Sequence, residues 1–423
     1  MLTERIQLQP GVWLNFVQTD RFKTGCFSFN LLRPLTMNAA ASNALLPSVL
    51  LRGSREYPDM QQISCRLDTL YGGSCGTLVR KKGEVQSVGL YADFLEDRYA
   101  ESEPVFSQMM AFIRSILFEP CMGEDGFVEE YVSGEKLNLS NTIDSRINEK
   151  RTYAVSRLMK HMCADEAYAV PRLGEKETLE RETGRTLFDR WQTLLATSPV
   201  ELFYLGQQPR DVVLTEMEKL ASALPRRTQT VMPQTQRLCP SRPVQYVEEA
   251  MDVTQGKLTI GLRTPITVHD SRYPAMMLLN AVYGSGMTSK LFEKIREEQS
   301  LCYYANSSMD KFKGIMVVGS GIEFVNYEVA RDGILYQLEQ CKQGAITTEE
   351  LEAARSYLLS ALRTGNDSPG RLDDYAIGQS IAGQTGSMDD LAEQLKGVTM
   401  DQVVEAANTL TLDTVYFLKG VEA

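Results

Sequence analysis

Histidine is scarce in this sequence. The chain of 423 residues contains only two histidines, His161 and His269, and they lie far apart. Hydrolytic zinc sites on helices commonly take two histidines four residues apart, because side chains at that spacing face the same way and can bind one metal ion. The sequence therefore excludes a two-histidine zinc motif at short spacing.

Paired cysteines and long apolar runs are also missing. The eight cysteines, at positions 26, 65, 75, 121, 163, 239, 302 and 341, include no CxxC pair, which argues against a zinc ribbon and a disulfide framework. No segment reaches the roughly 18 apolar residues of a membrane span, and the first residues carry charge where a signal peptide needs an apolar run. We therefore expect free thiols, no membrane span and a cytoplasmic location.

Basic charge is in deficit. The chain has 44 Lys and Arg against 55 Asp and Glu, a net charge of -11 and a pI near 5.0. Binding to phosphate backbones needs a basic surface, and no basic stripe offsets the acidic balance, which argues against nucleic acid or an anionic membrane surface as partner. With 43% hydrophobic and 23% charged residues, the composition is that of an ordinary globular protein with more than one domain.

The first part of the chain has the alternation of an α+β domain. Residues 12–17 and 26–32 are short apolar runs bounded by turn residues, a pattern that predicts two strands. Residues 43–52 predict an apolar helix that must kink or begin near Pro47, because proline lacks a backbone donor and clashes with the preceding turn. A second helix is expected over residues 60–70.

The same order of elements occurs twice. One hairpin is expected to turn at Lys82-Gly83 and a second at Lys313-Gly314, with the flanking strands and helices at a constant offset along the chain. Between the copies, residues 225–243 contain four prolines and little apolar periodicity, as a linker does. We therefore predict an α+β chain of two homologous domains, residues 1–224 and 244–423.

Arg296 and Tyr303 lie on either side of an expected helix-to-strand turn. Residues 289–298 have the spacing of a short amphipathic helix, and Leu301 begins an apolar, aromatic segment typical of a strand. A guanidinium and a phenol at such a turn can donate hydrogen bonds to a peptide carbonyl. The residue types alone also allow a surface arginine in a charge-rich helix beside a half-buried tyrosine.

This segment resembles a family signature. The run Leu-Phe-x-x-Ile-Arg-Glu, followed by Ser-Leu-x-Tyr, is similar to the C-terminal domain signature of the insulinase-type (M16) zinc metallopeptidases. In that family an arginine and a tyrosine seven residues later help to bind the substrate peptide, and Arg296 and Tyr303 have that spacing. The resemblance covers nearly the whole chain. It implies a tandem of homologous α/β sandwich domains like those of LuxS and the mitochondrial processing peptidase.

The zinc motif of that family is missing. Active members carry His-x-x-Glu-His on the first core helix, shortly before Gly-Thr or Gly-Ser, and the pair Gly53-Ser54 aligns this motif with Ala44, Pro47 and Ser48. These residues replace two ligands and the general base. The family's third ligand is matched by Glu135, but one carboxylate does not hold zinc tightly. The resemblance therefore implies a chain without a cofactor of its own, with zinc in a partner subunit.

The resemblance also implies a division of labour. Some M16 peptidases are heterodimers in which one subunit holds zinc and the other keeps only the Arg/Tyr pair. This sequence resembles the second kind, and more closely the bacterial zinc-less M16 proteins associated with elongation factor P modification. We expect a catalytically inactive, substrate-binding subunit that pairs with a zinc-bearing M16B-type homologue to process peptides. A peptide-binding or scaffold protein without proteolysis is the alternative, and homodimerisation of the isolated chain stays open.

Overall fold

The computed structural model describes residues 3–101, 103–225, 231–237 and 242–421. The chain divides into two compact units. Unit 1 contains Met1–Asp144, Val170–Gln234 and Ser368–Ser387, and unit 2 contains Ser145–Ala169, Thr235–Asp367 and Met388–Ala423. Part of the predicted linker, at 226–230 and 238–241, lies outside the described residues, as does Cys239. The seven described cysteines are free thiols.

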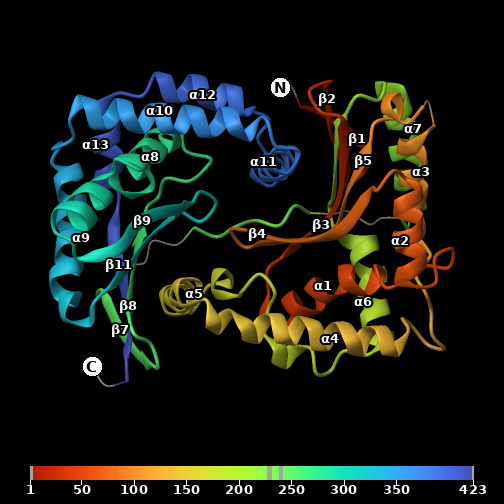
Figure 1. Ribbon diagram of the computed structural model, residues 1–423, viewed down its shortest axis with the longest axis horizontal. Helices are drawn as coiled ribbons and strands as arrows, with labels where there is room; N and C mark the ends of the chain where they lie inside the picture. The colour runs from red at the N-terminus through yellow and green to blue at the C-terminus, as the bar shows by residue number, and fades with distance from the viewer. Residues whose placement is uncertain (1–2, 102, 226–230, 238–241, 422–423) are drawn as a thin grey trace. The chain divides into compact units, whose positions relative to one another are not determined.

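The N-terminal half of the chain alternates strands and helices much as its periodicity predicts (Figure 1). Its strands are β1 (Glu4–Gln9), β2 (Val12–Gln18), β3 (Thr24–Pro34), β4 (Ser74–Lys82), β5 (Val85–Leu95) and β6 (Val200–Gly206). Its helices are α1 (Met37–Leu50), α2 (Met60–Thr69), α3 (Val105–Phe118), α4 (Glu129–Asp144), α5 (Lys150–Met162), α6 (Gly184–Thr197) and α7 (Arg210–Ala223). The predicted strands, the second helix and the hairpin are confirmed.

The C-terminal half follows the same order. Its strands are β7 (Gln245–Met251), β8 (Gly256–Arg263), β9 (Cys302–Asp310), β10 (Ile315–Ile322) and β11 (Thr411–Gly420). Its helices are α8 (Tyr273–Asn280), the π-helices η5 (Ala281–Ser285) and η6 (Leu291–Glu298), α9 (Tyr327–Lys342), α10 (Thr348–Gly365), α11 (Pro369–Ala382), α12 (Met388–Lys396) and α13 (Met400–Asn408). None of the described helices in either half is long and apolar enough to cross a bilayer.

One prediction about α1 is wrong. The helix neither begins near Pro47 nor is limited to residues 43–52, because it starts at Met37 and carries the proline in its interior. An interior proline removes a backbone hydrogen bond and costs about 3 kcal/mol. Ten of the fourteen residues of α1 are buried, and the burial of this apolar surface offsets that cost.

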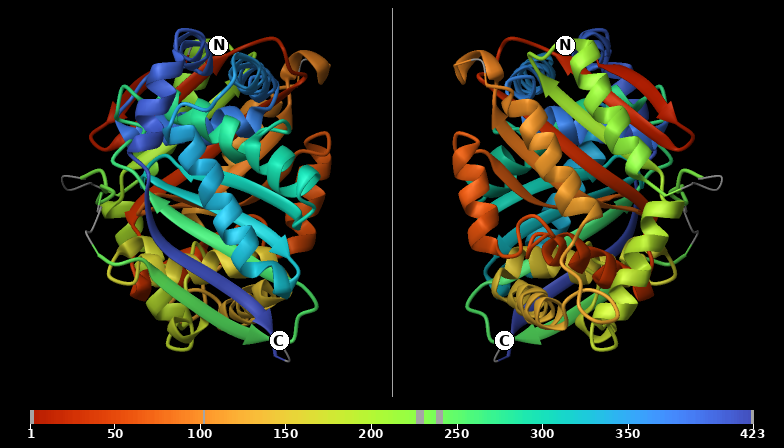
Figure 2. Two further views of the ribbon diagram at one scale, coloured as in Figure 1. Left: turned by 90° about the vertical axis from the view of Figure 1, so that its left-hand side faces the viewer. Right: turned by 90° about the vertical axis from the view of Figure 1, so that its right-hand side faces the viewer.

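The sheet of unit 1 has the order β1-β2-β6-β3-β5-β4 among the described residues, with β2 and β6 parallel and the other pairs antiparallel. Alternate residues of β3 face opposite ways. Phe27 and Phe29 point into a core that includes residues of α1 and α3, while Ser28 and Asn30 point to the other face. In Figure 1, α3 and α7 lie on one side of this sheet and α11 on the other, and the right view of Figure 2 looks onto α3 and α7.

The sheet of unit 2, within the described chain, has the order β7-β11-β8-β10-β9, with β7 and β11 parallel. Apart from β1, this is the order of unit 1 with each strand replaced by its counterpart, so the predicted repeat of one α+β unit is confirmed. Leu258, Ile260 and Leu262 point into a core with α8 and α9. The left view of Figure 2 looks onto this sheet from the side of α9.

Each unit takes one helix from the other half of the chain. The predicted domain limits, 1–224 and 244–423, describe continuous halves, whereas the compact units are interleaved. Helix α5 packs on β8 and β11 of unit 2, and α11 packs on β6 and β3 of unit 1. The reason is physical: a sheet has two faces, and the helices of its own half cover only one of them.

Buried ion pairs attach α5 to its sheet. Arg263, on the α5 side of β8 and only 2% exposed, donates to the carbonyl of Met162 at 2.7 Å, to Glu166 at 2.6 Å and to Asp413 at 2.7 Å. The ammonium group of Lys313, 0% exposed, lies 2.6 Å from the same Glu166 carboxylate. A cation at the C-terminal end of a helix also interacts favourably with the helix dipole.

We expect Arg263→Met to destabilise unit 2 by about 3 kcal/mol, because it leaves two buried carboxylates with one cation fewer. The exposed Arg98, in unit 1, supplies the control Arg98→Met, for which a change within about 0.5 kcal/mol is expected. Urea unfolding followed by far-ultraviolet circular dichroism measures the effect. Both tryptophans, Trp13 and Trp191, belong to unit 1, so fluorescence reports that unit separately. Equal midpoints for the two variants would contradict this role of Arg263.

The same ion pairs predict a pH dependence. Burial raises the pKa of Glu166, but hydrogen bonds from Arg263 and Lys313 outweigh burial and lower the pKa below its usual value. Burial also raises the pKa of Asp413, but hydrogen bonds from Thr414, Arg242 and Arg263 outweigh it and lower that pKa. Their stabilisation is thus present above the unfolded-state pKa values near 4 and is lost as the pH falls through the lowered folded-state values. The stability difference between wild type and Arg263→Met should shrink from pH 7 to pH 3, and a constant difference would refute it.

Candidate functional site

The predicted pair Arg296 and Tyr303 lines one open cavity of about 360 Å³ in unit 2. Arg296 comes from η6 and Tyr303 from β9, with Ser300 and Leu301 in the turn between them. Glu323 reaches the cavity from the end of β10. The pattern of the sequence gave no signal for Glu323, because its position beside the pair results from the pairing of β9 with β10.

Both members of the pair have exposed side chains. The side chain of Arg296 is 42% exposed, and its guanidinium lies 4.8 Å from the centroid of the Phe292 ring. Its Nε atom is 3.5 Å from the carboxylate of Glu297, an exposed ion pair that contributes at most about 1 kcal/mol. Tyr303 is 70% exposed. A fork of donors and a phenol hydroxyl are thus available to one ligand.

Buried anchors hold the backbone beneath the pair. Leu291 and Ile295 of η6 are fully buried, and the amide of Leu301 donates to the carbonyl of Ile295 at 3.2 Å. Ser300, the residue between helix and strand, has a φ of 52°, a strained value for a residue other than glycine. Both π-helices and strained backbone occur often at functional sites. The turn is therefore fixed in a costly conformation next to exposed hydrogen-bond donors.

Unit 1 has no metal ligand at the aligned zinc-motif positions. Ala44 and Pro47 are buried in α1 and Ser48 is half-buried. Glu135, on α4, accepts a hydrogen bond from Arg52 at 3.2 Å, and the Arg52 guanidinium lies 5.3 Å from the centroid of the Tyr131 ring. Throughout the described ranges, no group of three or more His, Cys, Asp and Glu side chains could hold a metal ion.

Comparisons with known proteins identify the family of the chain. The family model for "Peptidase M16 inactive domain" matches residues 186–358. The "Probable inactive metalloprotease YmfF" of Bacillus subtilis (strain 168) is 30% identical over 413 residues, which is 97% of this chain and 96% of that protein. The chain belongs to the peptidase M16 family. The resemblance seen in the sequence is thereby confirmed at the level of the family.

Solved structures of similar fold extend over the whole M16 chain. A conserved protein from Enterococcus faecalis V583 has a TM-score of 0.92 and 27% identity and covers 100% of both chains. The peptidase M16 inactive domain from Pseudomonas fluorescens has a TM-score of 0.79 at 14% identity and covers 100% of this chain and 99% of its own. The predicted tandem α+β fold of the family is confirmed.

We expect this M16 protein to retain well under one equivalent of zinc after equilibration with micromolar zinc and gel filtration, because Glu135 is a single carboxylate with Arg52 already beside it. Elemental analysis of wild type, Glu135→Gln and the control Glu130→Gln measures this, since Glu130 is exposed on the same helix. A full equivalent of zinc that disappears only in Glu135→Gln would overturn the expectation.

Proposed function

We propose that this M16 protein is the non-catalytic, substrate-binding subunit of a heterodimeric M16B-type zinc metallopeptidase. One observation carries the proposal: Arg296 and Tyr303 line a common cavity in a chain whose zinc-motif positions hold Ala44, Pro47 and Ser48. The chain thus has the residues that bind substrate in this family, and it lacks the residues that bind zinc. A zinc-bearing M16 homologue is the partner that such a chain requires.

The proposed role follows from the hydrogen-bonding groups of the pair. The Arg296 guanidinium and the Tyr303 hydroxyl are donors, and a peptide backbone offers carbonyl acceptors at regular spacing. Two donors on a fixed turn would orient a bound peptide, and orientation of the reacting group lowers the barrier to its cleavage. The partner would supply the zinc ion and the general base. We further propose a cytoplasmic complex, related to the M16 proteins associated with elongation factor P modification.

A peptidase assay with the zinc-bearing homologue tests the proposal. The mixture should cleave an unstructured peptide, and neither chain alone should do so at a comparable rate. Arg296→Ala should lower kcat/KM of the mixture by about ten- to a hundredfold, the value of one hydrogen bond to a charged group. Tyr303→Phe should lower it less, because a neutral donor is lost. The control Lys294→Ala removes a cation from the same helix that does not line the cavity, and it should leave turnover unchanged.

Two results would overturn the proposal. One is unchanged turnover in Arg296→Ala when the circular dichroism spectrum shows that the variant is folded. The other is the absence of both a stable complex and new activity on mixing. In the second case, retained binding of a labelled peptide by the isolated chain, lost in Arg296→Ala, would assign the chain to the non-proteolytic peptide-binding class.

A further inference from the structure

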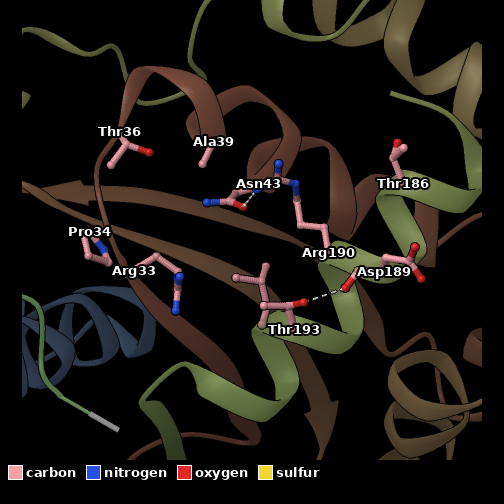
Figure 3. A pocket seen from close by; sticks show the side chains of 10 residues that line it. Arg33, Pro34, Thr36, Ala39, Asn43, Thr186, Asp189, Arg190 and Thr193 are labelled. Atoms are coloured by element: carbon pink, nitrogen blue, oxygen red, sulfur yellow. Dashed lines mark hydrogen bonds between the residues drawn. The ribbon is translucent and has the colours of Figure 1, made fainter. Parts of the chain in front are cut away.

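A second cavity, of about 370 Å³, lies in unit 1, apart from the residues considered so far (Figure 3). Its walls are the end of β3, the first turns of α1 and one side of α6. Two arginines line it: Arg33 comes from β3, and Arg190 extends from α6 toward Asn43 on α1. Two cations that line one cavity repel each other, and an anion bound between them offsets this repulsion.

Arg33 lacks a counter-ion. Its Nη1 atom donates to the hydroxyl of Thr197 at 3.1 Å, and across the described part of the chain no carboxylate lies within 4 Å of its guanidinium. Burial, and then the charge of Arg190, lower the pKa of Arg33. Both guanidinium-bearing side chains line the same cavity, so their like charges oppose each other there.

Arg190 is only loosely neutralised. Its Nη2 atom lies 3.7 Å from the carboxylate of Glu182, and its Nη1 atom is at 3.5 Å from the side-chain oxygen of Asn43. Its Nε atom is buried and has no hydrogen-bond partner among the residues that the structure describes. The carboxylate of Glu182 instead accepts short hydrogen bonds from Ser42 at 2.6 Å and Thr186 at 2.8 Å.

The start of α1 adds to the positive potential. Its N-cap residue, Thr36, makes no side-chain capping hydrogen bond, and the first turn contains no acidic residue, so the positive end of the helix dipole is not countered locally. The one carboxylate among the lining residues, that of Asp189, accepts a hydrogen bond from Arg185 at 2.9 Å and is mostly exposed. It therefore does not neutralise the two arginines.

We infer that this cavity binds an oxyanion, a phosphate or carboxylate group held between the guanidinium groups of Arg33 and Arg190. Both guanidiniums offer planar forks of donors that match such oxygens. The volume exceeds that of the oxyanion alone, and Pro34, Ala39 and Leu194 give the remainder an apolar lining. The ligand thus carries a small organic body or a short end of chain. A free small anion and the terminal carboxylate of a peptide both have this chemistry.

Isothermal titration calorimetry with three probes tests the inference and separates the two sources. The probes are inorganic phosphate and two hexapeptides of one sequence, ending in a free carboxylate or in an amide. We expect binding of phosphate, of the free-acid peptide or of both, and none of the amide. Free-acid binding at least tenfold tighter than phosphate identifies a peptide terminus, and phosphate binding alone identifies a small free anion.

Arginine variants locate the site. Arg33→Gln and Arg190→Gln should each weaken binding by at least about tenfold, because each removes charge-assisted hydrogen bonds. Arg98→Gln removes an exposed cation elsewhere in unit 1 and should bind as wild type does. Equal weakening in Arg98→Gln, or no heat from any probe at millimolar concentration, would overturn the inference.

One measurement needs no variant. A crystal of the wild-type chain soaked in selenate should give an anomalous peak between the guanidinium groups of Arg33 and Arg190, even if both variants fail to fold. Peaks confined to surface lysines would count against the site. Failure of this cavity to bind would leave the proposed role of Arg296 and Tyr303 untouched, because those residues belong to unit 2.

Discussion

The need to cover both faces of each sheet determines how this chain is organised. Helices of the same half bury the Phe27 face of β3 and the Leu258 face of β8, which leaves a second face on each sheet. Helix α11 covers one and α5 covers the other, each supplied by the opposite half. Buried charges secure both helices: Arg80 bonds Asp373 of α11, and Arg263 bonds the end of α5. If these buried charges were left unpaired, they would strongly destabilise the fold. Each unit therefore depends on the helix that the other half of the chain supplies.

The exchange of helices leaves the candidate binding residues in unit 2 and the expected zinc-motif positions in unit 1. In unit 2 a π-helix anchored by the buried Leu291 and Ile295, and an edge strand, hold Arg296 and Tyr303 at an open cavity. In unit 1 helix α1, with which the sequence is expected to align the family's zinc motif, is a core element that carries an interior proline. Arg52 now provides the counter-charge to Glu135. Packed side chains and one ion pair thus occupy these positions.

Local rules predicted most elements, and their limits are physical. The hairpins were predicted because glycine in a sequence marks a turn that needs a positive φ. Gly83 and Gly314 take φ values of 58° and 72°. Strands β1 and β7 were missed because both consist only of exposed and half-buried residues and so lack a buried apolar run. Helix α5 buries Leu158 and Met162, but nothing in the sequence around these residues indicates which sheet covers them. Arg296 and Tyr303 were predicted from a motif, whereas Arg33 and Arg190 line one cavity only because of the fold.

The long sequence separation between each sheet and the helix that it takes from the other half also determines the order in which the chain can fold. The hydrogen bond from Ser28 to Asp373 joins residues 345 positions apart. On the ribosome the strands of unit 1 emerge long before α11, and one face of their sheet stays bare until nearly the whole chain has been made. Contacts of such sequence separation form slowly, and an uncovered sheet face is prone to aggregation. The nascent chain therefore passes through a long stage in which one face of this sheet is uncovered.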